Sequence, residues 1–383
     1  MRLSGSLIVP AYAAGVVGAF LQISGGFWDV ASHILGIPDT FFTASHMILY
    51  AGVTLTLLAS LSGLVLRFSA FNSSGAERAF LTGMGISLVG GVLQIVAGPF
   101  DFWWHSQYGF DPFLFTPSHT LLIMGIVLSG LGMAVGSVRL LTAARSGMPL
   151  NSHFSIRRLE ILTIIAMATL WLVLNGLVYL LTDVDGISYT FKLGQAWIDQ
   201  AQPVAFVLTP VLLAGTGTLV FLAARKTLGW KGAASFVALI GVVVTATANL
   251  GFRSWFLSAS SIPDEVAQGA RIASFIPLYF LFTVPVVLFD IMVKPSSTGR
   301  WTIVAASLVA PFASFLDGFY SLVLWTSFVP LVPWLVIPML VAGSLAGFSR
   351  TRFVNALLSS SPFASLGSGL SVDKQTDQTS TKP

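Results

Sequence analysis

The chain has 383 residues, of which 55% are hydrophobic and only 9% are charged, and its mean hydropathy is +0.85. Because a soluble domain carries about 25% charged residues, this composition excludes a soluble globular protein and indicates an integral membrane protein. The sequence contains no cysteine, which excludes disulfides, thiolate metal sites and iron–sulfur clusters.

Apolar segments long enough for the roughly 20 residues of a spanning helix recur along the whole chain. Spanning helices tolerate the Gly and Pro residues that lie inside these segments. The sequence therefore predicts an all-α polytopic membrane bundle of about ten transmembrane helices, arranged as five outward-pointing hairpins. The expected spans centre on residues 7–26, 40–66, 79–99, 113–138, 159–181, 203–224, 232–252, 270–292, 301–323 and 329–348.

The basic residues predict how the bundle is oriented. With ten helices, nearly all of the 19 Lys and Arg residues fall on one side, and only Lys192, Arg253 and Arg271 fall on the other. Since Lys and Arg are enriched in cytoplasmic loops, we expect a multi-pass protein of the cell membrane with both termini in the cytoplasm. This topology also explains the basic pI of 9.5, which therefore does not indicate nucleic acid as a partner.

One pattern occurs twice in the first third of the chain. Residues 21–52, LQISGGFWDVASHILGIPDTFFTASHMILYAG, align with residues 93–125, LQIVAGPFDFWWHSQYGFDPFLFTPSHTLLIMG. Each copy has an aspartate, a histidine at the fourth place after it, and a second histidine thirteen or fourteen residues further on. The residues are Asp29, His33 and His46 in the first copy and Asp101, His105 and His119 in the second.

This spacing predicts two metal sites near the outer face of the membrane. Asp and His at positions i and i+4 share one helix face, and a hairpin would bring to them the second histidine, about two turns inside the next helix. Two imidazole nitrogens and one carboxylate suit copper, zinc or iron and leave positions open for water, oxygen or substrate. The alternative is a hydrogen-bond cluster that only fixes the hairpin, although ionisable groups at membrane depth are usually functional.

Four more polar residues accompany the repeat and are candidates to support the ligands. Gln22 and Gln94 each precede their aspartate by seven residues. They either hydrogen-bond between helices or hold a ligand in place. Asp39 and Asp111 are expected to be helix N-caps more readily than ligands, because Asp is a favoured cap and Pro112 suits the first helical position.

The spacing D-x3-H-x12-H, followed by a polar residue and x3-H-x13-H, resembles that of the C subunit of the copper membrane monooxygenases. This family includes particulate methane monooxygenase and ammonia monooxygenase, and the resemblance covers about residues 15–130. It implies a copper site in each copy of the repeat, held by the aspartate and histidines named above. Asp101 stands where the family has asparagine, so the second site is expected to be more anionic.

The rest of the chain is expected to be a second unit without metal ligands. Residues 1–145 would form the metal-site membrane domain, residues 146–350 a second membrane half with degenerate hairpins, and residues 351–383 a disordered cytoplasmic tail. Because no histidine follows His153, the hairpins of the second half should serve as scaffold, partner surface or pocket wall. Three aspartates of the second half are expected to be solvated: Asp183, Asp185 and Asp199.

Three functions remain open on these residues. The first is a copper-dependent monooxygenase, or a subunit of one with partner subunits, that oxidises a small apolar substrate with dioxygen. The second is a non-catalytic membrane protein that binds or transfers copper or zinc. The third is a b-type haem protein with His46 and His119 as axial ligands, which leaves the aspartates and the i+4 histidines unexplained. Candidate walls of a substrate pocket are Phe41, Phe42, Phe113 and Phe115.

Overall fold

The computed structural model describes most of the first two thirds of the chain and short parts of the rest. The described residues are 8–34, 40–69, 75–109, 113–146, 155–258, 283–294, 304, 337–338, 340–347 and 349. Within them every regular element is a helix and no strand occurs, as the all-α prediction requires. The helices are α1 (Ile8–Ile34), α2 (Ala44–Ser69), α3 (Gly75–Tyr108), α4 (Pro117–Arg145), α5 (Ile156–Thr182), α6 (Val184–Phe191), α7 (Gln195–Leu228), α8 (Ala233–Ser258) and α11 (Thr283–Met292).

Six described helices are long and apolar enough to cross a membrane, namely α1, α2, α3, α4, α5 and α7. These helices are compatible with a multi-pass membrane protein. The apolar part of α8, Ala233–Thr247, is shorter, and α6 is a short helix that the sequence did not predict. At least half of each expected span at 270–292, 301–323 and 329–348 lies outside the described residues, so the count of ten stays a prediction.

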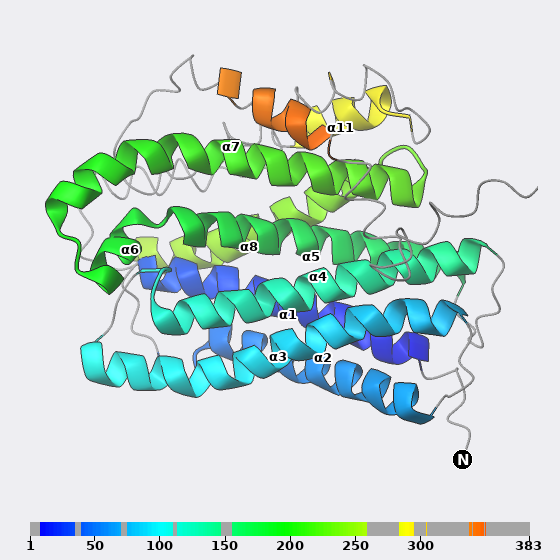
Figure 1. Cartoon of the computed structure of the whole chain (residues 1–383), viewed down its shortest axis with the longest axis horizontal. Coiled ribbons are helices and arrows are strands. Elements are labelled where there is room, and N and C mark those ends of the chain that lie inside the picture. The colour runs from blue at the N-terminus through cyan, green and yellow to red at the C-terminus, as the bar shows by residue number, and fades with distance from the viewer. Residues whose placement is uncertain are drawn as a thin grey trace, which may run out of the picture.

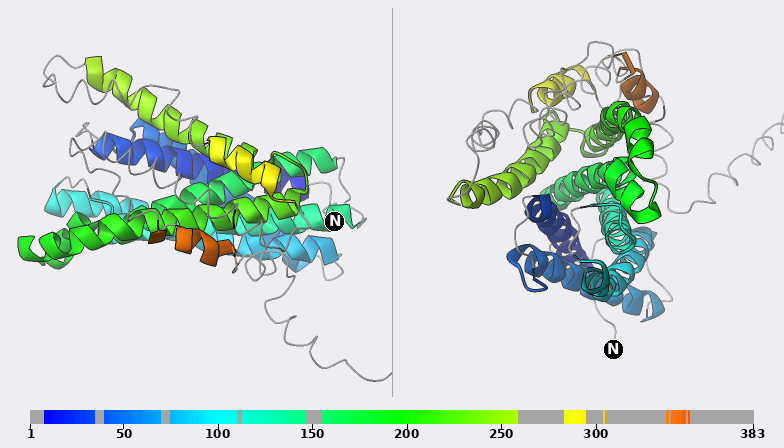
Figure 2. Two further views of the ribbon diagram at one scale, coloured as in Figure 1. Left: turned by 90° about the horizontal axis from the view of Figure 1, so that it is seen from above. Right: turned by 90° about the vertical axis from the view of Figure 1, so that its left-hand side faces the viewer.

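The first four helices form a ring in which each helix contacts its two neighbours (Figures 1 and 2). The hairpin α1–α2 and the hairpin α3–α4 are the two copies of the sequence repeat. Because α1 pairs with α4 as α2 pairs with α3, the two copies are related by an approximate half-turn about the long axis of the bundle. The connections α1–α2, α3–α4 and α5–α7 lie at the same end, which we call the tip end.

Glycines bring the paired helices into close contact at equivalent places in both copies. A Cβ atom on Gly18 of α1 would lie 2.7 Å from the carbonyl oxygen of Gly52 of α2. The equivalent Cβ on Gly90 of α3 would lie 2.5 Å from the carbonyl oxygen of Gly125 of α4. Since small residues let helix backbones approach inside a membrane, the repeat is a packing repeat as well as a sequence repeat.

The two glutamines of the repeat meet in the middle of the ring. Gln94 Nε2 donates to Gln22 Oε1 at 3.0 Å, and both side chains are buried. Each also bonds the second helix of its own hairpin, Gln22 Nε2 to Thr56 Oγ1 at 2.9 Å and Gln94 Nε2 to Ser129 Oγ at 3.0 Å. The structure thus shows the expected interhelical hydrogen bonds, and they tie the two hairpins together.

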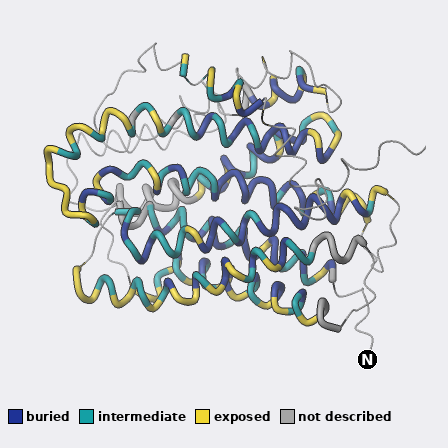
Figure 3. Tube along the Cα trace, in the orientation of Figure 1, coloured by how far each residue is buried: buried dark blue, intermediate teal, exposed yellow. Residues whose placement is uncertain are grey.

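The second half of the chain covers one side of this ring. Helix α5 packs against α1 and α4, and α7 and α8 pack against α5 in turn. Helices α4 and α5 contain the largest share of buried residues, whereas one face of α3 is exposed (Figure 3). At the end opposite the tips, the buried pair Arg225 and Asp290 joins α7 to α11, with Arg225 Nε 3.4 Å from Asp290 Oδ1.

The starts of α2 and α4 differ from the sequence-based expectation. Helix α4 begins at Pro117, and Thr116 is its N-cap, with its hydroxyl accepting from His119 N at 3.4 Å. The N-cap of α4 is therefore Thr116 and not Asp111, because Thr116 and Pro117 form a favourable cap and first helical residue further along the chain. Helix α2 begins at Ala44. The second histidines consequently lie in the first turn of their helices, and not two turns inside them as predicted.

Candidate metal centre

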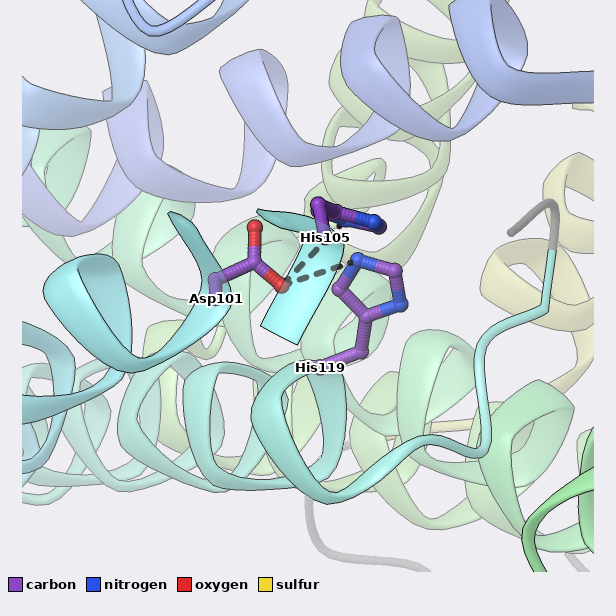
Figure 4. A group of neighbouring side chains, drawn as sticks. All are labelled: Asp101, His105 and His119. Atoms are coloured by element: carbon purple, nitrogen blue, oxygen red, sulfur yellow. Dashed lines mark ion pairs between the residues drawn. The ribbon is translucent and has the colours of Figure 1, made fainter. Parts of the chain in front are cut away.

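The three candidate ligands of the second copy converge at the tip end of α3 and α4 (Figure 4). Asp101 Oδ1 lies 3.6 Å from His105 Nε2 and 3.3 Å from His119 Nε2. One ligand atom from each residue lies within 4.8 Å of the others. Ligands bonded at ~2.0–2.2 Å to one ion are at most ~4.4 Å apart, so a small side-chain shift would place all three around a single metal.

Backbone carbonyls fix the orientation of both imidazoles. His119 Nδ1 lies 2.7 Å from the carbonyl oxygen of Phe113, and His105 Nδ1 lies 3.2 Å from that of Gly109. Because a carbonyl oxygen can only accept a hydrogen bond, both Nδ1 atoms must carry a proton. In neutral imidazoles, both Nε2 atoms then direct their lone pairs at the Asp101 carboxylate. Metal-binding histidines are usually oriented by such a contact to the second ring nitrogen.

The electrostatics of this arrangement disfavour three groups without an added proton or cation. Neutral imidazoles would direct two Nε2 lone pairs at the Asp101 carboxylate, and a proton on one of the groups or a cation between them would remove this repulsion. Asp101 Oδ1 is buried and accepts no hydrogen bond in the described part of the chain. His119 is also buried, with 8% of its surface exposed. Buried charge without a partner is costly, and one bound cation would satisfy all three groups.

The first copy shows the same arrangement for two of its three candidate ligands. Asp29 Oδ1 lies 3.1 Å from His46 Nε2, and His46 Nδ1 lies 2.9 Å from the carbonyl oxygen of Thr40. The carbonyl that orients the histidine belongs in both copies to the sixth residue before it. His33 follows Asp29 by one turn of α1, but its side chain lies outside the described residues.

The two carboxylates differ in their hydrogen bonds. In the first copy, Ser45 Oγ donates to Asp29 Oδ1 at 3.1 Å. In the second copy, Oγ of the equivalent Ser118 lies 3.5 Å from Thr116 Oγ1. Because a hydroxyl donor partly neutralises the Asp29 carboxylate, Asp101 retains more of its negative charge than Asp29 does. Asp39 and Asp111, the other candidate supporting residues, lie outside the described residues.

An apolar cavity of about 100 Å³ lies between α1, α4 and α5 and reaches both copies of the repeat. One candidate ligand from each copy forms part of its wall, namely Asp29 and His119. The rest of the wall is almost entirely apolar and includes Ile23, Phe27, Leu122, Ile126 and Val173. Of the four phenylalanines expected to form a pocket, Phe113 lines this cavity. Phe41 and Phe42 are exposed instead.

The positions of His46 and His119 do not suit the haem interpretation. Each directs Nε2, the nitrogen that would have to bind a haem iron, at the aspartate of its own copy. Axial haem ligands would need two free imidazole nitrogens facing one another across a flat cofactor. The geometry therefore favours two separate centres over one haem.

Asp183 is a residue near the site whose role the sequence did not predict. It was expected to be solvated, but its Oδ2 accepts from Leu114 N at 2.7 Å and from Phe115 N at 2.8 Å, directly before α4. The expectation is wrong because Asp183 ends α5 and caps α6, which brings its carboxylate to the tip of the neighbouring hairpin. Asp199 is exposed as expected and accepts from Gln195 Nε2 at 2.9 Å.

Comparison of the chain with family models, with curated proteins and with solved structures found no match.

Proposed function

We propose that this chain is a membrane metal-binding protein that holds copper at Asp–His–His centres and oxidises a small apolar substrate with dioxygen. It would act alone or as one subunit of a membrane complex, in the manner that the resemblance to the C subunit of copper membrane monooxygenases implies. The observation that carries the proposal is the convergence of Asp101, His105 and His119 to within 4.8 Å. Nδ1 of His105 and Nδ1 of His119 each form a hydrogen bond with a backbone carbonyl.

A metal accounts for this cluster better than hydrogen bonds alone. A hydrogen-bond cluster would need at least one imidazole protonated, and the other, neutral imidazole would still direct its Nε2 lone pair at the carboxylate. Neutral imidazoles would instead leave the carboxylate facing two lone pairs. A bound cation uses two nitrogen lone pairs and one carboxylate oxygen without any added proton, which is the ligand chemistry of copper, zinc and iron sites.

Each residue then has a defined task. Nε2 of His105, Nε2 of His119 and Oδ1 of Asp101 hold the metal, and the carbonyls of Gly109 and Phe113 keep the imidazoles in the required tautomer. Copper, when bound, supplies the activation of dioxygen, which protein side chains alone do not perform. The protein contributes ligand geometry and a water-poor space beside the metal.

The apolar cavity supports a small apolar substrate. Its volume of about 100 Å³ is smaller than the ~150 Å³ of an engineered apolar cavity that stays dry and binds benzene or xenon. A molecule of a few heavy atoms would fit, and such a molecule reaches the cavity by partitioning into the lipid bilayer. Because His119 and Asp29 lie in the wall, a molecule in the cavity would lie next to both centres.

A second function, non-catalytic binding or transfer of copper or zinc, is favoured by one observation. Asp101 gives the second centre a carboxylate whose buried Oδ1 accepts no hydrogen bond in the described part of the chain. Added anionic charge favours divalent zinc or iron(II) over copper(I). A zinc ion in this centre would leave the centre without redox chemistry.

The proposed location is the cell membrane, with the termini in the cytoplasm and the centres near the outer face. Arg145, at the end of α4, lies at the end opposite the tips and bonds the carbonyl oxygens of Thr227 and Leu228. Arg225 lies at the same end. Basic residues at that end and candidate ligands at the tip end agree with the positive-inside rule.

Metal analysis of the purified full-length protein tests the proposal. Wild-type protein from copper-supplemented cells should contain up to two equivalents of metal, and His105→Ala should lose about one of them. His153→Ala is the matched control, because His153 belongs to neither copy of the repeat. Substrate-dependent oxygen consumption would then distinguish the oxygenase from the binding protein. Wild-type protein that retains no copper, zinc or iron would overturn the proposal.

A further inference from the structure

Asp183, between α5 and α6, accepts hydrogen bonds from the backbone that precedes His119. Besides the two bonds from Leu114 N and Phe115 N to Asp183 Oδ2, Asp183 Oδ1 accepts from Gly186 N at 3.0 Å. One carboxylate thus binds three backbone N–H groups on two separate segments of the chain. A carboxylate that accepts several charge-assisted hydrogen bonds forms a strong and directional contact.

The segment that Asp183 holds is the one that orients a candidate ligand. Residues 113–116 contain the carbonyl of Phe113, which bonds His119 Nδ1, and the N-cap of α4. Helix α6 adds two further contacts to this segment. Thr190 Oγ1 donates to the carbonyl oxygen of Phe115 at 2.5 Å, and the Tyr189 ring lies 5.0 Å from that of Phe113.

The corresponding segment of the first copy is held in a different way. There Thr43 Oγ1 donates to the carbonyl oxygen of Thr40 at 3.2 Å, and Phe42 N donates to Thr40 Oγ1 at 3.4 Å. Residues 113–115 are Phe, Leu and Phe, which offer no hydroxyl for such local bonds. In the second copy, Asp183 therefore supplies from another helix what threonines supply locally in the first.

We propose that Asp183 is a positioning residue for the second centre, and that the second half of the chain tunes the metal affinity of that centre through it. By fixing residues 113–116, Asp183 keeps the Phe113 carbonyl against His119 Nδ1 and holds Nε2 toward Asp101. The inference rests on the proposed metal-binding function. Loss of such a supporting contact typically lowers metal affinity ~10–100-fold.

Two substitutions perturb this contact independently. Asp183→Asn replaces one carboxylate oxygen by an NH2 donor, which cannot accept from a backbone N–H. Gly186→Ala leaves the charge unchanged, but its Cβ would lie 2.3 Å from Asp183 Oδ2 and would push the carboxylate away. The matched controls are Asp199→Asn, at an exposed acid on α7, and Gly215→Ala, where an added Cβ meets nothing within 4 Å.

The test uses the full-length protein in detergent, with zinc(II) and copper(II) as probes. In Asp183→Asn and Gly186→Ala, the affinity of the second centre should fall ~10–100-fold, while that of the first centre stays unchanged. The copper(II) paramagnetic resonance spectrum of the second centre should change in both variants. In metal-free protein, hydrogen exchange at the amides of Leu114 and Phe115 should become faster. Both controls should behave as wild type in every measurement.

Each outcome decides between the two proposals. Unchanged affinity and unchanged exchange at Leu114 and Phe115 would overturn the role of Asp183. Equal loss at both centres, together with a lower Tm, would show general destabilisation and would also overturn it. If the wild-type protein binds neither probe, the metal function fails. The exchange rates and the nitrogen-15 shifts of the His119 ring in the metal-free variants then still test whether Asp183 positions this side chain.

Discussion

At the residue scale, the spacing of the repeat predicted which side chains meet but not how they are oriented. Asp101, His105 and His119 come together as the hairpin geometry required. The partners of the two Nδ1 atoms are backbone carbonyls, at Gly109 and Phe113. Every residue type carries such a carbonyl, so no pattern of side chains could have indicated them.

Substitution of Asp101 should change the metal preference of the second centre. Asp101→Asn removes one negative charge and retains an oxygen ligand, so zinc(II) should lose more binding free energy than copper(I). We expect the zinc affinity to fall at least ~10-fold, which corresponds to ~1.4 kcal/mol, while copper(I) is retained. Competitive titration with metal indicators measures both, with Asp199→Asn as the control. An equal loss of both metals would contradict the charge argument.

Asp185, in the first turn of α6, should make stability depend on pH. Partial burial raises its pKa, and the nearby Asp183 carboxylate raises it further. The unfolded chain has a pKa of ~3.9 for such a group. The protonated group therefore stabilises the fold below pH ~4, and this contribution is lost as the pH rises through the raised pKa.

Asp185→Asn should consequently raise the Tm at pH 7, because it removes the charge that the folded state disfavours. At pH 4 the effect of the substitution should be smaller, since a larger fraction of the wild-type group is then protonated. The gain at pH 7 should be small, because Asp185 is exposed to solvent. Thermal unfolding in detergent at the two pH values is the measurement. A loss of stability at pH 7 would show that the charged form makes a favourable contact.

At the element scale, close packing of α3 on α4 should be sensitive to a single methyl group. A Cβ on Gly132 would lie 2.4 Å from the carbonyl oxygen of Gly83 and 2.4 Å from Ser87 Oγ. Gly132→Ala should therefore force the helices apart and lower the free energy of unfolding by ~1–3 kcal/mol.

Gly85→Ala on α3 is the control for this prediction, because an added Cβ there meets nothing within 4 Å. Alanine stabilises a helix by up to ~1 kcal/mol relative to glycine, so Gly85→Ala should be neutral or stabilising. Unfolding of both variants by SDS in mixed micelles gives the comparison. Equal effects of the two substitutions would mean that the helices do not pack through Gly132.

Helix positions were easier to predict than helix starts. The long apolar runs predicted α1 to α5 and α7, because length and hydropathy alone specify a spanning helix. The start of α4 was misplaced, because Asp111–Pro112 and Thr116–Pro117 are similar starting signals. A distant residue distinguishes them: Asp183 binds the N–H groups of Leu114 and Phe115 in a non-helical segment.

At the scale of the whole molecule, the first half was more predictable than the second. A duplicated pattern reveals itself by comparison with its own copy, and the hairpins α1–α2 and α3–α4 were identified in this way. The contact between Asp183 and Leu114 joins residues 69 positions apart, and neither belongs to a repeated motif. Sequence could assign the second half a scaffold role but could not say which centre it supports.

The cavity unites both halves, because α1 and α4 come from one and α5 from the other. Gly176 of α5 lines it, and an added Cβ there meets nothing within 4 Å. Gly176→Leu should therefore fill the cavity and abolish binding of xenon, measured by xenon-129 NMR, without loss of metal. Gly215→Leu on α7 is the control, since an added Cβ there also meets nothing within 4 Å. Unchanged xenon binding in Gly176→Leu would mean that the gas binds elsewhere.

The orientation of the bundle gives the last prediction. Candidate ligands lie at the tip end, and the buried pair of Arg225 and Asp290 lies at the opposite end. A membrane protein retains basic residues on its cytoplasmic side, so the tips should face outward. Reporter fusions that end after Ser146 should read cytoplasmic, and fusions that end after Gly194 should read external. The reverse readings would contradict this orientation and would place both centres on the cytoplasmic side of the membrane.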